Sequence, residues 1–84
     1  MRVTLKLFAS LGPYLPAQER GGNAVTLDLP DDTTIAQAIE PFGLPPKLVH
    51  LVLVNGVFVP PERRASHALC DTDVLAIWPP VAGG

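Results

Sequence analysis

The sequence predicts an α+β fold in which one short helix packs on one face of a sheet. Three observations support this: segments where apolar and polar residues alternate, one helical stripe of apolar residues behind a capping motif, and an Asn-Gly pair between two apolar runs. The 84 residues amount to one domain. The expected order is strand, strand, helix, strand, strand, strand. Because one short helix covers only one face, apolar side chains on the other face are left for a partner.

The first two strands are expected at residues 2–8 and 25–29. In both segments apolar residues alternate with polar ones, which is the period of a half-buried strand, and Pro30 ends the second. Residues 9–23 between them contain several glycines and prolines, so they predict a long connection with one short helical turn. We expect the two strands to pair as an antiparallel hairpin.

A short helix is expected after Thr34. Thr34 and Gln37 fit a capping box, in which each side chain accepts a hydrogen bond from the other residue's backbone N–H. One apolar stripe follows at helical spacing: Ile35, Ala38, Ile39 and Phe42. Pro41 has no N–H to donate, so the regular helix should be short or distorted after Glu40.

The last three strands are expected at residues 50–54, 57–59 and 74–78. Asn55 and Gly56 favour a type I′ turn, which joins the first two of these strands as a hairpin. Residues 62–68 form a polar loop that contains Arg63 and Arg64. We expect this arginine pair to be solvated, or to meet an acidic partner. Residues 71–73 turn the chain into the last strand.

Charge and apolar run lengths exclude two classes of partner. Six cationic against eight acidic side chains give a net charge of -2, which makes no basic face for nucleic acid. The longest apolar run, residues 51–54, is far too short to span a membrane. The single cysteine, Cys70, forms no internal disulfide, and this favours a reducing cytoplasm.

The chain carries no recognisable catalytic grouping. We find no Ser/His/Asp set, no paired carboxylates and no glycine-rich phosphate loop, so the protein is not expected to be an enzyme by itself. His67 and Cys70 are three residues apart, but two ligands fall short of a tetrahedral metal site, and no metal is expected. Cys70 is expected to have a structural role as a small apolar residue beside Leu69.

The C-terminal segment, PPVAGG, is the chemically distinctive part of the sequence. Two prolines favour an extended exit from the last strand, and glycine lets backbone approach a catalytic wall closely. Six residues span roughly 20 Å when extended, enough to enter a partner's active site. The reactive group at the tip is the Gly84 carboxylate. AMP transfer from ATP would activate it, and a sulfur nucleophile displacing AMP would leave a thiocarboxylate.

Residues 71–84, DTDVLAIWPPVAGG, resemble the closing motif of the MoaD/ThiS sulfur carriers, D-G-D-x-V-x-F-F-P-P-V-x-G-G. Thr72 stands where that motif has a glycine. Further segments also resemble the family, so the likeness spans nearly the whole chain: residues 3–11, 27–30, 34–35 and 53–56. The resemblance implies a ubiquitin-like β-grasp fold, a mixed five-stranded sheet on one main helix, with the last strand central beside the first. It divides the chain into a domain, residues 1–78, and a flexible tail, residues 79–84.

The resemblance also implies a function. A separate ATP-dependent adenylating enzyme, of the MoeB/ThiF kind, activates Gly84, and sulfur transfer makes a thiocarboxylate; the carrier itself binds no cofactor. In molybdopterin synthase the tail enters a large subunit that passes the sulfur to a pterin precursor, whereas a related carrier feeds thiazole formation in thiamine synthesis. The long first connection favours the molybdopterin type. A ubiquitin-like modifier joined through Gly84 to lysines, and an interaction module with an inert tail, are alternatives.

The expected site consists of the tail and of aromatic residues near its base. Gly84 and Gly83 carry the acyl chemistry. Seven further residues, along the tail and among the aromatic side chains, are expected to contact partners: Trp78, Pro79, Pro80, Val81, Ala82, Phe8 and Phe58. In the last strand Leu75 and Ile77 face inward and Trp78 faces outward. Trp78 is either an interface residue or a buried one, whereas base rates favour the core for the two phenylalanines.

Overall fold

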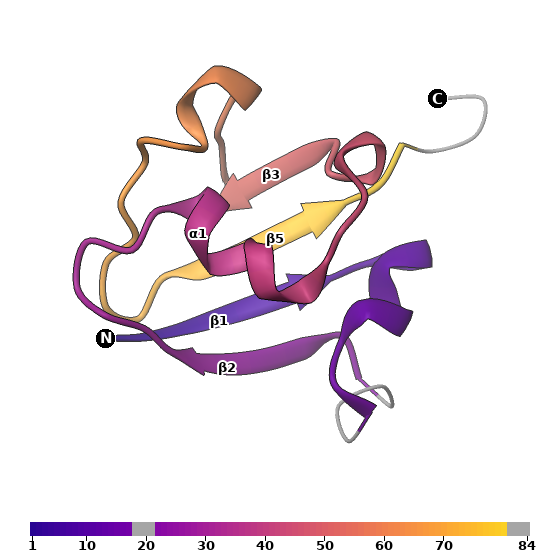
Figure 1. The fold of residues 1–84 in the computed structure, drawn as a ribbon, viewed down its shortest axis with the longest axis horizontal. Coiled ribbons are helices and arrows are strands. Elements are labelled where there is room, and N and C mark those ends of the chain that lie inside the picture. Colours follow the sequence, from indigo (N-terminus) through magenta and orange to yellow (C-terminus); the bar gives the residue numbers. More distant parts are fainter. Residues whose placement is uncertain (18–21, 81–84) are drawn as a thin grey trace.

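The computed structural model describes residues 1–17 and 22–80. Five strands form one sheet in the order β2-β1-β5-β3-β4. Their bounds are β1 Arg2–Leu7, β2 Ala24–Asp28, β3 Leu51–Val54, β4 Val57–Phe58 and β5 Val74–Trp78. The α-helix is α1, Ile35–Ile39. Short 3-10 helices accompany it: η1 Ala9–Tyr14, η3 Glu40–Phe42, η4 Pro46–Leu48 and η5 Pro61–Arg63. In Figure 1 α1 lies in front of the sheet, which gives the predicted α+β layers with one main helix.

The sheet is mixed, and β5 lies in its centre. The first two strands form the predicted antiparallel hairpin, and β1 pairs with β5 in parallel. On its other side β5 pairs with β3 in antiparallel register. The last strand is therefore central beside the first, as the family resemblance implies, and neighbours on both sides fix its position.

The start and the end of α1 follow from the predicted signals. The Thr34 hydroxyl accepts a hydrogen bond from the Gln37 N–H at 3.2 Å, and the Gln37 side chain accepts one from the Thr34 N–H at 3.0 Å, which confirms the capping box. The regular helix ends at Ile39 and the chain continues as η3, because Pro41 cannot donate a helical hydrogen bond.

The core lies between α1, η1 and the face of the sheet that they cover. Its most deeply buried side chains come from the three central strands, from α1, and from η1 with the residue that follows it: Val3, Leu5, Leu7, Leu11, Leu15, Ile35, Val52, Leu75 and Ile77. Leu75 and Ile77 are fully buried, whereas Val74, Ala76 and Trp78 are only partly buried. The predicted inward and outward faces of β5 are confirmed.

A polar cluster holds the start of β5. Asn55 and Gly56 have φ angles of 52° and 82°, so the predicted turn with two positive φ values is present. The Asn55 side chain donates to Asp73 at 2.8 Å and accepts from the Val74 N–H at 2.8 Å. Asp73 also accepts from the Cys70 N–H at 2.8 Å. These bonds tie the β3–β4 turn to the residues that begin β5.

Two expectations about single side chains are wrong. Arg63 is exposed as predicted, but Arg64 is buried, because three backbone carbonyls accept hydrogen bonds from its guanidinium group and replace water. Cys70 is exposed and does not pack as a small apolar residue, although its neighbour Leu69 is buried. Cys70 lies in the turn before β5, where its N–H rather than its thiol makes the structural contact.

Candidate functional site

The strand β5 brings the chain to the proposed tail in a fixed direction. The Phe8 N–H donates to the Ile77 carbonyl at 3.1 Å, and the His50 N–H donates to the Trp78 carbonyl at 3.2 Å. Pro79 is buried and Pro80 is exposed. The remaining predicted tail residues, Val81, Ala82, Gly83 and Gly84, lie outside the described residues. The site that can be described is therefore the base of the tail.

Apolar side chains gather on the outer face of the sheet, opposite α1. Residues that pair across neighbouring strands point to the same face. The register joins Lys6 to Ala76, Ala76 to Leu53 and Leu53 to Phe58, and a second row joins Trp78 to Leu51. Together with Phe8, the apolar members form what we call the tail-root patch: Phe8, Leu51, Leu53, Phe58, Ala76 and Trp78.

Two of the predicted aromatic residues stack on each other in this patch. The rings of Phe8 and Trp78 are 4.0 Å apart between centroids and 1° from parallel. Both are partly buried on the outer face, so Phe8 does not belong to the core, where base rates place phenylalanine. Phe58 is 51% exposed, and the core expectation is wrong for it too. Phe8 and Trp78 therefore border the tail base, whereas Phe58 lies on the edge strand β4, in the row that runs through Leu53 to Ala76.

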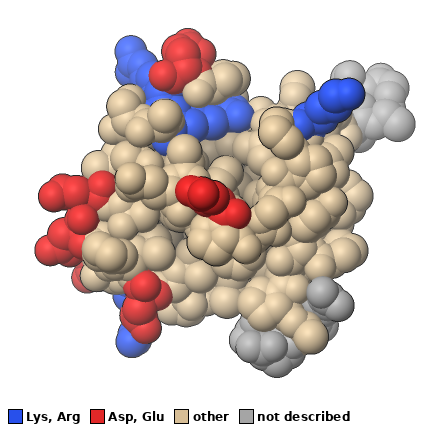
Figure 2. Space-filling model, in the orientation of Figure 1, with Lys and Arg blue, Asp and Glu red and all other residues tan. Residues whose placement is uncertain are grey.

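Charges are distributed unevenly over the molecule. Acidic residues cluster where β1 and β5 begin and β2 ends: Asp28, Asp31, Asp32, Asp71 and Asp73. On the face drawn in Figure 2, no acidic side chain of the described residues lies on the right-hand side, toward which β5 runs in Figure 1. On the outer face Lys6 sits within the row that ends at Phe58. Lys6 therefore places one positive charge beside Ala76 in the tail-root patch.

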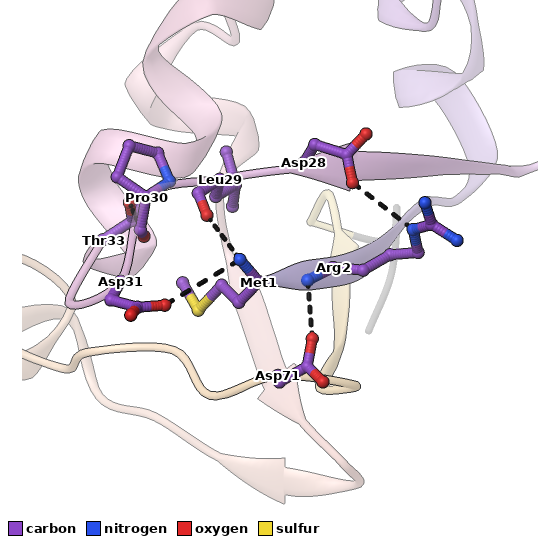
Figure 3. A network of polar contacts seen from close by, with 8 residues as sticks. All are labelled: Met1, Arg2, Asp28, Leu29, Pro30, Asp31, Thr33 and Asp71. Carbon is purple, nitrogen blue, oxygen red and sulfur yellow. Dashed lines mark hydrogen bonds and ion pairs between the residues drawn. The ribbon is translucent and has the colours of Figure 1, made fainter.

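A polar depression lies at the opposite end of the sheet, and the charged groups that line it contact one another. Its volume is about 620 Å³, and Arg2, Asp28 and Asp71 are among its lining residues. The Arg2 guanidinium lies 3.3 Å from the Asp28 carboxylate, and the Arg2 backbone N–H donates to Asp71 at 2.7 Å (Figure 3). These contacts join the ends of β1 and β2 to the turn before β5. We assign them to the fold rather than to ligand binding.

Other chemistries find no support in the part of the chain that the structure describes. Within residues 1–17 and 22–80, no three His, Cys, Asp or Glu side chains come together as metal ligands do. Cys70 precedes β5 and the tail follows it, so the length of a five-residue strand, roughly 13 Å between its ends, separates the thiol from the tail base. Across the same described ranges, every helix is too short or too polar to cross a membrane.

The sequence analysis missed three contributors to the tail base, namely Leu51, Leu53 and Lys6. An apolar run such as residues 51–54 does not show which of its side chains face the helix. Only the register between β3 and β5 places Leu51 beside Trp78 and Leu53 beside Ala76. The sequence offers one indirect signal for these three residues. Once the outward side chains of the last strand are assigned, the residues that pair with them on the neighbouring strands must also point outward.

Comparison with known proteins agrees with this architecture. The model of the ThiS family matches residues 14–84. No curated protein matches the chain in sequence. Among solved structures, SAMP1 from Haloferax volcanii is 27% identical with a TM-score of 0.69, and the match covers 100% of both chains.

Two more distant structures share the fold. The complex of subunits 1 and 2 of molybdopterin-converting factor from Helicobacter pylori matches at 21% identity and a TM-score of 0.62, covering 100% of both chains. Urm1 from Trypanosoma brucei matches at 19% identity and a TM-score of 0.66, covering 99% of this chain and 95% of that one. With a central β5 leading to a Pro-Pro-Val-Ala-Gly-Gly terminus, and with a family match over most of its length, the chain belongs to the ThiS family of ubiquitin-like sulfur carriers.

Proposed function

We propose that this protein carries sulfur as a thiocarboxylate on Gly84 and is itself no enzyme. The Gly84 carboxylate attacks the α-phosphate of ATP on a separate adenylating enzyme of the MoeB/ThiF kind, and pyrophosphate leaves. A hydrosulfide equivalent then attacks the carbonyl carbon and AMP leaves, so that one carboxylate oxygen is replaced by sulfur. ATP is the partner's substrate, and the carrier needs no bound cofactor. The single cysteine suits a reducing cytoplasm as the site of this cycle.

The observation that carries this proposal is the continuity of β5 with the tail beside an apolar surface. Trp78 is the last residue of a central strand, and only Pro79 and Pro80 separate it from the Val-Ala-Gly-Gly end. The tail-root patch lies on the outer face of the sheet beside this exit, and partly exposed aromatic side chains are the residue type that dominates protein–protein binding energy. We propose that the patch docks on the partner while the tail enters its active site.

Molybdopterin synthesis is the sulfur-accepting pathway that we propose, with thiamine thiazole formation as the alternative. The connection between β1 and β2 is long and contains η1, which resembles the molybdopterin type of carrier. The Helicobacter pylori structure named above is a complex of the two subunits of molybdopterin-converting factor. By analogy, the acceptor would be a large subunit that receives the tail and transfers sulfur to a pterin precursor.

A role as a ubiquitin-like protein modifier is the second candidate. It is favoured by the likeness to Haloferax volcanii small archaeal modifier protein 1, which is 25% identical and has a TM-score of 0.66. In that case the activated Gly84 carbonyl would be attacked by a lysine amine of another protein, with AMP or a thiol as the leaving group. Both candidates use the same activated terminus and differ in the nucleophile.

Intact-mass analysis separates these possibilities. The chain is incubated with ATP, a sulfide source and the adenylating enzyme of its source organism. A sulfur carrier gains the mass difference between one sulfur and one oxygen. An unchanged mass contradicts the proposal and favours an interaction module with an inert tail, and a ladder of larger adducts in cell extract favours the modifier.

Deletion of Gly84 tests whether the terminus is the reacting group. We expect the shortened chain to show no mass change in the same incubation, because its terminus no longer reaches the adenylating centre. Its melting temperature should stay within about 2 °C of the parent, since terminal residues contribute little packing energy. Full activation of the shortened chain would refute the role of Gly84. A matched substitution elsewhere in the sequence, Gln18→Ala, should leave activation intact.

A further inference from the structure

Arg64 is a buried cation at the junction of three segments of the chain. Its Nε donates to the Val59 carbonyl at 3.1 Å, Nη1 to the Val49 carbonyl at 3.0 Å, and Nη2 to the His50 carbonyl at 3.0 Å. Burial lowers the pKa of the guanidinium group, and Glu62 acts in the opposite direction. The planar fork of arginine fits several acceptors at once, which a lysine ammonium does not. The side chain therefore fixes the chain just before β3 to the chain just after β4.

One of these acceptors belongs to a peptide group that also holds the tail base. The Val49 carbonyl and the His50 N–H are parts of the same peptide group. The described chain contains no cis peptide bond, so this group is planar and trans, and its C=O and N–H point to opposite sides. The carbonyl accepts from Arg64, and the N–H donates to the Trp78 carbonyl at 3.2 Å. Fixing one side of the group fixes the direction of the other.

The hydrogen bond to the Trp78 carbonyl holds the start of the tail in place. This carbonyl belongs to the peptide group between Trp78 and Pro79, which has no N–H because its nitrogen is a proline nitrogen. The next peptide group, between Pro79 and Pro80, lacks an N–H for the same reason. These two groups can only accept hydrogen bonds. Rotation of the first group about its neighbouring bonds would redirect everything that follows it.

We propose that Arg64 is a positioning residue that aims the C-terminal tail. It holds the peptide group of Val49 and His50, and this group in turn holds the carbonyl from which the tail departs. Arg64 itself lies on the far side of that peptide group from Trp78 and touches no reacting atom. The consequence for activation rests on the proposed function, but the positioning itself does not.

Hydrogen exchange tests the positioning directly. In the unchanged protein the His50 N–H should exchange at least about tenfold more slowly than an unprotected amide, although the His50 side chain is exposed. In Arg64→Lys its exchange should accelerate at least about fivefold relative to the core amides of β1 and β5. Val3→Ala is the matched control, because it weakens the core far from this peptide group and should leave that ratio unchanged. Fast exchange in the unchanged protein, or the same ratio in both variants, would overturn the proposal.

Kinetics of adenylation test the consequence. With the adenylating enzyme saturated by ATP, Arg64→Lys should raise KM for the carrier at least about fivefold and leave kcat within about twofold, because a misdirected tail enters the active site less often. Val3→Ala should change neither value while it remains folded. Equal KM values for the two variants would contradict the aiming role. If the unchanged protein is not activated at all, the proposed function fails, but the hydrogen-exchange experiment still decides the role of Arg64. If Arg64→Lys does not fold, Arg64→Gln takes its place in the exchange experiment.

Discussion

Both faces of the sheet carry large apolar side chains, but the surroundings of these side chains are opposite. On the inner face, Leu75 and Ile77 of β5 are fully buried under α1 and η1. On the outer face, Trp78 of the same strand is partly buried, and Phe58 of β4 is 51% exposed. Hydrophobicity alone therefore does not decide which side chains form the core. The position of the helix decides it, and strand alternation then assigns each residue to a face.

This difference indicates that the two faces contribute to different free energies. Inner-face side chains of the three central strands β1, β5 and β3 remove nearly all of their apolar area from water on folding, so they stabilise the domain. Outer-face side chains keep part of that area exposed and can bury it only against another molecule. Stability and partner binding should therefore respond to different substitutions within one five-residue strand.

Leu75→Ala should have the largest effect on stability. Truncating a fully buried leucine removes apolar contacts and leaves a cavity, at a cost of about 2–5 kcal/mol in the free energy of unfolding. Denaturant titration followed by circular dichroism measures this loss. Val74→Ala, one residue earlier on the outer face, is the control and should cost about 1 kcal/mol or less. Equal losses for the two variants would refute the assignment of the faces.

Trp78→Ala should affect partner binding more than it affects the stability of the domain. Loss of the stacked pair with Phe8 should lower stability by about 0.5–1.5 kcal/mol. Affinity for the adenylating enzyme should fall at least about tenfold, because a large aromatic residue at the centre of an interface carries much of the binding energy. Titration calorimetry with the purified partner gives the affinity. Thr4→Ala, on the same face but away from the tail, should bind normally; an unchanged affinity of Trp78→Ala would remove the tail-root patch from the interface.

Much of this comparison could be predicted from local sequence signals. The capping box at Thr34, the Asn55-Gly56 turn and the alternation along β5 each depend on residues close together in sequence, and the structure confirms them. The central place of β5 and the nature of the tail came from the family resemblance, because strand order is set by pairing between distant segments.

The remaining features depend on contacts that the sequence does not display. Arg64 follows another arginine in a polar loop, and its burial requires three carbonyls that only the folded chain brings together. The exposure of Phe58 depends on the register between β3 and β4 at the edge of the sheet. Base rates favour burial for phenylalanine, but β4 is an edge strand of two residues, and within the described ranges a neighbouring strand flanks it on one side only.

Thr72→Gly should have the smallest effect on the free energy of unfolding. Because Thr72 lies in the turn before β5, the substitution should not favour one face of the sheet over the other. Thr72 has a φ of 72°, a left-handed conformation that a β-branched residue adopts at a cost of about 1–2 kcal/mol. Its N–H donates to the Arg2 carbonyl at 2.8 Å, so the conformation is part of the turn that sets the register of β5. Glycine relieves the strain but adds freedom to the unfolded chain, so we expect a net gain of about 0.5–1 kcal/mol.

The melting temperature measures this gain, which should amount to about 4 °C for a domain of this size. Thr26→Gly is the control, because Thr26 is an exposed residue of β2 without a positive φ, and there glycine should lower stability by about 0.5–1 kcal/mol. A melting temperature that falls equally in both variants would show that the Thr72 side chain stabilises the turn. A gain seen only in Thr72→Gly would instead show that the turn before β5 carries backbone strain. The same turn sets the register of β5, which keeps Leu75 buried and Trp78 on the outer face.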